Sequence, residues 1–260
     1  MNRINPNSLF LGKKNRYLPT CQSTNDIVSQ ELAAIPPAPE GFLAWTGEQT
    51  AGRGQRGNSW EAAPGQNLTF SLLLKPQFLK ASEQFLLSMA VSLGLRDMLR
   101  QHLPATAEIK VKWPNDLFAD GEKIAGILIE SQLRGTMLGE AIVGIGLNVN
   151  QRHFAHPNAL SMHTVSGHVF ELPALLERLM VDLEQRYLQL KSHQYTQLRQ
   201  SYHQCLYAHE QWRVFEDLRK PSPALFNGKI RGVDPLGRLC IEEQAGNVEA
   251  FSMKEVGFVH

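Results

Sequence analysis

The sequence predicts an α+β fold, in which helices cover a central mixed, mostly antiparallel sheet and a small module of β-strands follows. Two observations support this prediction. Segments with alternating apolar residues follow one another along the chain, and segments with helical periodicity are few and separate. Past about Ala208 only short strand patterns remain. We therefore expect a large domain over residues 1–207 and a small β domain over residues 208–260.

The first elements are a strand and a helix. A short strand pattern surrounds Tyr17, and the segment CQSTNDIVSQELAA indicates a turn that leads into a helix. Ser23 or Thr24 is the expected helix cap, and Asp26 follows Ser23 at the spacing of a capping box. The helix is expected to end before the loop IPPAPE, because proline interrupts helical hydrogen bonding.

The next segments predict the rest of the central sheet. FLAWTGEQ and NLTFSLLL are typical of strands, and a glycine-rich loop joins them. Helical spacing runs from Ser82 to Leu103, and EIKVKW then returns to a strand pattern. The Asp-Gly pair of PNDLFADGEK predicts a tight turn, followed by the strands IAGILIES and LGEAIVGIGLNVN. Because strands follow strands directly here, the sheet is expected to be mostly antiparallel.

Two helices and the β module complete the chain. An apolar face predicts a helix from Leu172 to Leu190, and YTQLRQSYHQCLY predicts another, so we expect both to cover one face of the sheet. The segments WRVFE, GKIRGVD, RLCIEE and VEAFSM are short strand patterns, with DPLG as a turn. The proline-containing segment KPSPALF is expected to be a loop.

Composition and charge narrow the class of protein. The 260 residues are 43% hydrophobic, which is enough for a core without disulfides. The net charge of +1 provides no basic field, so no DNA partner is expected. Three scattered cysteines without a C-x-x-C pair favour reduced thiols over a disulfide framework or a zinc site. Without a signal peptide or a long apolar run, we expect a cytoplasmic protein that does not contact membranes.

The segment TAGRGQRGNSW contains a literal G-x-G-x-x-G in Gly52, Gly54 and Gly57. A dinucleotide-binding fingerprint requires a helix to begin inside the glycine run and an acidic residue after the next strand, and neither is present. A P-loop is excluded because no Lys-Ser or Lys-Thr follows. Arg53 and Arg56 instead indicate a flexible loop that binds phosphate or carboxylate. A solvated glycine-rich hairpin is the alternative.

Three further polar clusters accompany this loop. The first ends a predicted strand and comprises Lys112, Trp113, Pro114, Asn115 and Asp116. The second is Lys123, at the start of an apolar strand, where an edge cation without a ligand is an equally good interpretation. The third is the period-two set Gly144, Gly146, Asn148 and Asn150. Together the clusters offer cations for phosphate, a carboxylate for a metal-bound phosphate and space for a ring against the sheet.

At these residues the chain resembles the biotin protein ligases, also called biotin-[acetyl-CoA-carboxylase] ligases or holocarboxylase synthetases. STN, GRGQRGNSW, KWPND, KIAGIL and GIGLNVN occur in the family's order and spacing, and the likeness extends into the C-terminal module. It implies the class II aminoacyl-tRNA synthetase-like fold of biotin and lipoate ligases for the catalytic residues 1–207. It also implies an SH3-like β-barrel for residues 208–260. Because the pattern begins close to Met1, we expect the monofunctional class, without the N-terminal DNA-binding domain of bifunctional members.

The resemblance implies roles for individual residues. Lys123 and Arg53 are the expected catalytic cations. The implied biotin-binding residues are Ser23, Thr24, Asn25, Gln49, Arg53, Gly54, Gln55 and Lys123. The implied nucleotide-binding residues are Arg56, Trp60, Lys112, Asn115, Asp116 and Asn148. No residue is implied as a protein ligand of a metal ion, and PNALSMHTVSG resembles the segment that closes over adenine. Gln55 and Asn58 stand where the family often has arginine, which predicts weaker retention of the adenylate.

The activity implied by the resemblance is ATP-dependent biotinylation, with ATP, Mg²⁺ and biotin as ligands. Biotin would react with MgATP to biotinyl-5′-AMP, and a lysine of a biotin carboxyl carrier protein or domain would then accept the biotinyl group. A lipoate or octanoate ligase is the closest alternative, and a non-catalytic biotin sensor is the alternative from another class. Monomer and homodimer both remain open, although an exposed edge strand offers a surface for pairing.

Overall fold

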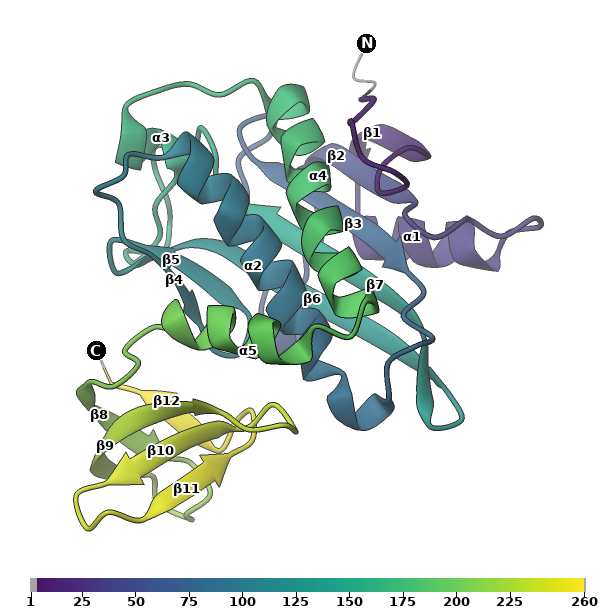
Figure 1. The fold of residues 1–260 in the computed structure, drawn as a ribbon. Coiled ribbons are helices and arrows are strands. Elements are labelled where there is room, and N and C mark those ends of the chain that lie inside the picture. Colours follow the sequence, from purple (N-terminus) through teal and green to yellow (C-terminus); the bar gives the residue numbers. More distant parts are fainter. Residues whose placement is uncertain (1–3, 260) are drawn as a thin grey trace.

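The central sheet has the predicted mixed, mostly antiparallel architecture (Figure 1). A computed structural model describes residues 4–259, except for the side chain of Arg56. The seven strands are β1 (Asn15–Cys21), β2 (Leu43–Gln49), β3 (Leu68–Leu74), β4 (Ile109–Lys112), β5 (Asp116–Ala119), β6 (Glu122–Arg134) and β7 (Met137–Leu147). Their order is β1-β2-β3-β7-β6-β5-β4, in which β1 and β2 are parallel and all other neighbours antiparallel.

Helices cover both faces of this sheet (Figure 1). On one face lies α1 (Thr24–Ala33), which contacts β2, β3 and β7. On the other face lie α2 (Phe85–His102), α4 (Leu172–Lys191) and α5 (Tyr195–Gln204). α2 contacts β4 and β5, while α4 and α5 pack against α2. The two C-terminal helices therefore cover the expected face together with α2. The remaining helical segments are η1 (Gln55–Gly57), η2 (Ala81–Glu83) and α3 (Met162–Ser166).

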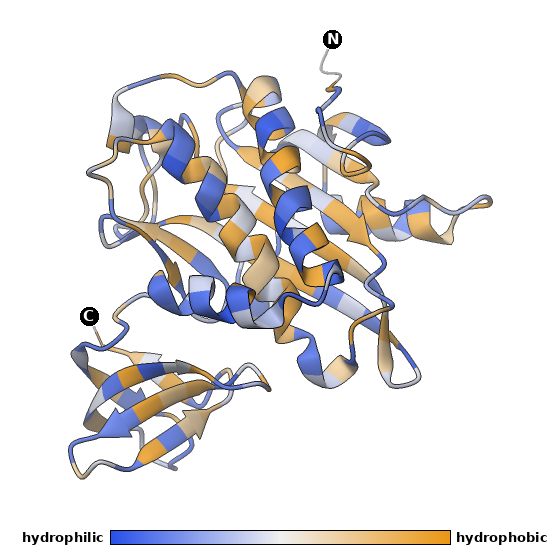
Figure 2. Ribbon diagram, viewed as in Figure 1, coloured by the Kyte–Doolittle hydropathy of each residue, from blue (hydrophilic) through white to orange (hydrophobic). Residues whose placement is uncertain are grey.

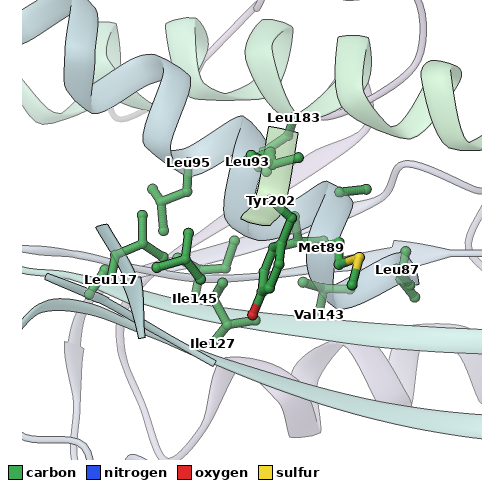
Figure 3. Packing of buried hydrophobic residues seen from close by; sticks show 14 of the residues in the cluster. Leu87, Met89, Leu93, Leu95, Leu117, Ile127, Val143, Ile145, Leu183 and Tyr202 are labelled. Atoms are coloured by element: carbon green, nitrogen blue, oxygen red, sulfur yellow. The ribbon is translucent and has the colours of Figure 1, made fainter. Parts of the chain in front are cut away.

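The strand β3 illustrates why the sheet lies between two helical layers. All seven of its residues are buried. Leu68, Phe70 and Leu72 pack into the large core under α2, whereas Leu73 packs into a smaller cluster with Val28 of α1. Apolar residues concentrate on the strands of the sheet (Figure 2). Figure 3 shows the large core, where Tyr202 of α5 points between sheet residues. This burial raises the pKa of the Tyr202 hydroxyl.

The start of α1 differs from the capping-box prediction. Ser23 does occupy the cap position, with extended backbone angles of φ −150° and ψ 133°. Its side chain nevertheless makes no capping hydrogen bond among the described residues, and Asp26 instead forms an ion pair with Arg53. The prediction was wrong because the spacing identifies the helix start but does not reveal other partners for these side chains. The first turn of α1 presents them to a cavity, as described below.

The predicted Asp-Gly turn joins β5 to β6. Asp120 and Gly121 both have positive φ, at 49° and 87°, which is the backbone that favours this residue pair in two-residue hairpins. β6 and β7 then form a second hairpin around Gly135, which also has positive φ. Because β5 lies between β4 and β6, Asp116 at the start of β5 is opposite both Lys112 of β4 and Gly126 of β6, so that residues from separate motifs meet.

The C-terminal module is a five-stranded antiparallel sheet in the order β11-β10-β9-β8-β12. Its strands are β8 (Trp212–Asp217), β9 (Ala224–Val233), β10 (Leu239–Glu243), β11 (Val248–Phe251) and β12 (Val256–Phe258). The sequence did not predict β12, because three residues are too few for a period-two pattern. It also placed the start of β9 in the loop KPSPALF, since prolines usually interrupt strands.

The C-terminal module is attached to the larger part of the chain by specific contacts. Trp113 Nε1 donates to the carbonyl oxygen of Gly237 at 2.9 Å, and the Val233 amide donates to His203 Nε2 at 3.1 Å. Just before the module begins, Leu206 forms a parallel bridge to the backbone of Val111, which covers the outer edge of β4. Among residues 4–259, no helix is long and apolar enough to cross a membrane.

Candidate functional site

A cavity of about 290 Å³ lies where the glycine-rich loop, the start of α1 and the central sheet meet. Residues of β2, β3, β6 and β7 and of the turn between β4 and β5 line it, together with residues of β12 from the C-terminal module. Twelve of the implied site residues line this cavity. They are Ser23, Thr24, Asn25, Gln49, Arg53, Gly54, Gln55, Trp60, Lys112, Asn115, Asp116 and Lys123. The structure therefore brings together motifs that are up to about a hundred residues apart in the sequence.

The two remaining implied residues are placed differently. The side chain of Arg56 lies outside the described part of the structure. Asn148 is buried outside the cavity lining, and its Nδ2 donates to the carbonyl oxygen of Leu160 at 3.0 Å. Because β7 ends at Leu147, the predicted period-two face does not continue from the glycines to Asn148 and Asn150. Asn148 instead supports the segment 157–167 that resembles an adenine-covering loop.

The S-T-N triplet forms a polar floor in the cavity. Ser23, Thr24 and Asn25 are all buried. The Thr24 backbone amide donates to Gln49 Oε1 at 2.8 Å, and the Thr24 hydroxyl lies 2.7 Å from the Ser71 hydroxyl. Asn25 Oδ1 accepts a hydrogen bond from Ser71 Oγ at 2.5 Å. These short side chains therefore offer uncharged donors and acceptors, which suit a neutral polar ligand.

The glycine-rich loop carries Arg53 to the edge of the cavity. Arg53 Nη2 lies 2.8 Å from Asp26 Oδ1 and 3.4 Å from Glu130 Oε2, so the guanidinium connects the loop to α1 and β6. A side chain at Gly52 would overlap the backbone carbonyl of Trp60, to which the loop folds back. Glycine at this position permits that close approach. The loop thus holds a cation where a carboxylate or phosphate in the cavity can replace its present partners.

The space predicted for a ring against the sheet is filled by the protein itself, by Trp60 at Gly146 and by Asn25 at Gly144. Cβ atoms at Gly126 and Gly146 would contact the Trp60 indole, and at Gly146 they would overlap it. The Trp60 indole therefore lies flat against these glycines of β6 and β7. Its Nε1 is buried and has no hydrogen-bond partner among the described residues. A buried N–H group without a partner costs free energy, and a polar ligand that accepts from it or displaces the ring would remove this cost.

Two lysines bring positive charge to the other end of the cavity. Lys123 Nζ lies 2.8 Å from Asp116 Oδ1, and its side chain is 35% exposed. Lys112 Nζ lies between the rings of Phe118 and Phe258, at 4.7 and 4.8 Å from their centroids. Burial lowers the pKa of Lys112, and the nearby Lys123 acts in the same direction. The arrangement concentrates cations beside a single carboxylate.

The acidic residues near the cavity fit Mg²⁺ that arrives with a nucleotide better than a metal held by protein alone. Among the described residues, no three His, Cys, Asp or Glu side chains are grouped closely enough to hold a metal ion. Asp116 does line the cavity beside Lys112 and Lys123. Mg²⁺ is usually held by one or two carboxylates together with substrate phosphates. Asp116 is the one carboxylate among the described residues that line the cavity. The amide of Asn115 already donates to the carbonyl oxygen of Ile127.

Sequence reasoning missed the contribution of the C-terminal module. Lys254, Val256 and Phe258 line the cavity from β12 and the turn before it. Lys254 has positive φ, at 80°, a backbone conformation that normally favours glycine. The motif pattern gave no signal for these residues, because their position depends on how the module packs onto the turn after β4. Thr69 and Phe70 of β3 also line the cavity; the sequence predicted their strand, but no polar motif marked them.

Comparisons with known proteins agree with this geometry. Residues 17–148 match the biotin/lipoate A/B protein ligase family. The biotin-[acetyl-CoA-carboxylase] ligase of Paracoccus denitrificans is 30% identical over 232 residues, which cover 85% of this chain and 92% of that protein. The bifunctional ligase/repressor BirA of Bacillus spizizenii is 31% identical over 224 residues, 83% of this chain. This chain spans about two thirds (66%) of the length of that relative.

Solved structures share the fold. A biotin protein ligase from Aquifex aeolicus, determined in complex with biotin and ATP, superposes with a TM-score of 0.77 at 21% identity. The match covers 95% of this chain and 99% of that one. The expected α+β fold, with a C-terminal β module after the central sheet, is therefore confirmed over nearly the whole chain.

Proposed function

Because the chain belongs to the biotin/lipoate A/B protein ligase family, we propose that it is an ATP-dependent biotin protein ligase. In this proposal it converts biotin and MgATP to biotinyl-5′-AMP and then biotinylates a lysine of a biotin carboxyl carrier protein or domain. One observation carries the proposal: the polar floor and the cations meet in one cavity of about 290 Å³. Residues 1–207 would carry the chemistry, and residues 208–260 would form a separate β domain that closes one side of the cavity.

In the first step the biotin carboxylate attacks the α-phosphate of ATP, and pyrophosphate leaves. Such a reaction needs no nucleophile from the protein, because the two substrates react with each other. The protein holds them in line and neutralises the developing charge. In this proposal Lys123, whose Nζ now lies 2.8 Å from Asp116 Oδ1, would contact both reacting groups. Bound Mg²⁺ supplies further positive charge on the phosphates.

Arg53 is the second cation of this step. It now pairs with Asp26 and Glu130, both about half exposed, so these ion pairs are weak enough to be exchanged for a ligand. Movement of the loop that carries Arg53 would enclose the mixed anhydride and exclude water from it. In the second step the amine of the carrier lysine attacks the anhydride, the amide forms and AMP leaves.

The floor of the cavity favours biotin over lipoate and octanoate. Thr24 and Asn25 are buried and Gln49 is partly exposed; Thr24 bonds to Gln49 directly and to Asn25 through Ser71. A ureido ring can bond to the donors and acceptors that these groups have left, whereas an alkyl chain or a dithiolane would cover them without a partner, at a cost in binding free energy. A non-catalytic sensor is disfavoured because it would not need the cations Lys123 and Lys112 beside Asp116.

The partner and location follow from this activity. The macromolecular substrate is a biotin carboxyl carrier domain, and the reaction would take place in the cytoplasm, where ATP and carboxylases are found. No DNA partner is proposed, because the net charge of +1 provides no basic surface field.

Biotin-dependent exchange of labelled pyrophosphate into ATP tests the adenylation step. The purified chain is incubated with Mg²⁺, ATP and labelled pyrophosphate, in parallel with biotin, lipoate, octanoate or no acid. We expect exchange with biotin. Exchange with lipoate or octanoate in place of biotin would assign the chain to the other branch of its family. Exchange with none of the acids would favour the sensor.

A further inference from the structure

We propose that Glu130 is a positioning residue that sets the hydrogen-bonding direction of the cavity floor, and thereby its preference for a ureido ring. This inference rests on the proposed function. Glu130 belongs to β6, its side chain is 46% exposed, and it lies behind the residues that line the cavity. Glu130 Oε2 accepts a hydrogen bond from Asn25 Nδ2 at 2.5 Å. Glu130 would therefore act on a ligand through Asn25.

Asn25 continues into a chain of hydrogen bonds across three elements. Asn25 Oδ1 faces Ser71 Oγ of β3 at 2.5 Å, and Ser71 Oγ lies 2.7 Å from Thr24 Oγ1 of α1. Ser71 is completely buried, and Thr24 and Asn25 are nearly so. Gly144 of β7 leaves the space that the Asn25 amide occupies, since a Cβ there would overlap Asn25 Oδ1. The chain is therefore rigidly held and shielded from solvent.

The Glu130 carboxylate at the end of this chain of hydrogen bonds determines which group donates in each bond. An ionised carboxylate can accept hydrogen bonds but cannot donate them, so Asn25 must turn its NH₂ group toward Glu130. Asn25 Oδ1 then faces Ser71, which must donate its single hydroxyl proton there. The oxygen of Ser71 is left to accept from the Thr24 hydroxyl. One charged group thus determines the orientation of three uncharged groups, two of which line the cavity.

The direction of these hydrogen bonds also determines which donors and acceptors the cavity floor offers to a ligand. The single proton of the Thr24 hydroxyl is donated to Ser71 Oγ at 2.7 Å in preference to Gln49 Oε1, which lies farther away at 3.3 Å, so the Thr24 oxygen keeps lone pairs for a ligand. Gln49 Oε1 accepts the Thr24 backbone N–H, so Gln49 Nε2 remains as a donor. A ureido ring offers both N–H donors and a carbonyl acceptor, which match a floor with fixed acceptors and donors. Glutamine at position 130 has both a donor and an acceptor, so it would permit the chain to reverse and the match to be lost.

Glu130 has a second neighbour, which the test must separate from this effect. Arg53 Nη2 lies 3.4 Å from Glu130 Oε2, but it lies closer, at 2.8 Å, to Asp26 Oδ1. Among the described residues, Asp26 forms its ion pair with Arg53 and makes no hydrogen bond to the side chains of Asn25, Ser71 or Thr24. Asp26→Asn therefore disturbs the Arg53 ion pair and leaves the chain of hydrogen bonds intact. Ser71→Ala breaks the chain of hydrogen bonds and leaves the Arg53 ion pair intact.

The test measures binding of biotin and of 2-iminobiotin, which carries an N–H in place of the ureido oxygen, to the full chain by isothermal titration calorimetry. We expect Glu130→Gln to raise the Kd for biotin about tenfold, as for loss of one charge-assisted hydrogen bond. The preference for biotin over 2-iminobiotin should fall in Glu130→Gln and in Ser71→Ala, and should be retained in Asp26→Asn. In steady-state assays the KM for biotin should rise while the KM for MgATP stays unchanged.

The possible results separate this inference from the proposed function. An unchanged Kd and an unchanged preference in Glu130→Gln would overturn the inference, and so would an equal loss of preference in Asp26→Asn, because the Arg53 ion pair would then explain both. In either case wild-type binding of biotin would leave the proposed function intact. Wild-type protein that does not bind biotin would overturn the proposed function itself. Because Glu130→Gln is isosteric and partly exposed, the variant is expected to fold.

Discussion

Replacing Lys123 with alanine should remove most of the adenylation activity. Lys123 is the cation at the start of β6, with Nζ at 2.8 Å from Asp116 Oδ1 and 35% of the side chain exposed. In the proposed reaction this nitrogen faces the carboxylate and the α-phosphate, where negative charge develops. The substitution therefore deletes a preorganised cation and leaves the carboxylate of Asp116 without its partner.

The size of the effect follows from the geometry. If Lys123 Nζ approaches the developing charge as closely as it now approaches Asp116 Oδ1, at 2.8 Å, the attraction is about 6 kcal/mol at an effective dielectric constant of about 20, and about 1.5 kcal/mol in water. A partly exposed group lies between these limits, so a loss of about 3 kcal/mol is expected in the transition state. Such a loss lowers the rate about 10²-fold, which is also typical of removing one donor to a developing oxyanion.

Biotin-dependent pyrophosphate exchange measures this step directly. Lys110→Ala is the matched control, because Lys110 of β4 has similar exposure (30%), pairs with Glu108 at 3.3 Å and does not line the cavity. The control should exchange at close to the wild-type rate. If Lys123→Ala also exchanged within about threefold of wild type, a change of less than 1 kcal/mol, Lys123 would not be a catalytic residue.

Four further predictions concern the loop, the cavity, the N-terminal segment and the module contact. Arg53→Ala should speed release of biotinyl-5′-AMP about tenfold, measured as an off-rate, and an unchanged rate would limit Arg53 to loop packing. Gly146→Val should raise the Kd for biotinyl-5′-AMP about tenfold, because the valine side chain would overlap the Trp60 ring. Titration calorimetry measures this Kd, and an unchanged value would contradict the prediction. Glu184 accepts the backbone N–H groups of residues 9, 10 and 11, so Glu184→Gln should lower the free energy of unfolding in urea by about 1.5–3 kcal/mol. A smaller change is expected for the control Glu177→Gln, because Glu177 is partly exposed and accepts one backbone N–H, that of Asn5. Burial, and secondarily His209, lowers the pKa of His203 below its usual value of about 6.5, so the folded state favours the neutral ring. The stabilisation from His203 should be complete above pH 6.5 and should be lost as the pH falls toward the lowered pKa. A His203→Gln variant that loses stability over the same pH range would refute this assignment.

Local sequence patterns predicted the sheet and most of the cavity, because they depend on short-range periodicity and on residue types at fixed spacing. The strand β3 and the Asp120–Gly121 turn are examples, since alternation and positive φ leave clear traces in a sequence. The loop cation Arg53 and the lysine at the start of β6 were likewise expected at the site, and both line the cavity.

Contacts between distant segments were not predictable in this way. The ion pair of Arg53 with Asp26 replaced a predicted capping box, because residue spacing cannot distinguish a local partner from a distant one. The packing of Trp60 on Gly146 depends on how the loop folds back over the sheet. Phe258 reaches the cavity from a three-residue strand, which is too short to have a recognisable period. Each of these features depends on tertiary packing.

Transfer of biotin to a carrier domain tests the central claim most directly. The full chain would be incubated with biotin, MgATP and an unmodified biotin carboxyl carrier domain, and the intact mass of the carrier would be measured before and after the reaction. We predict that the carrier gains one biotinyl group on one lysine, and that AMP and pyrophosphate are released in equal amounts. A carrier of unchanged mass, when a known biotin protein ligase modifies the same preparation, would contradict the account.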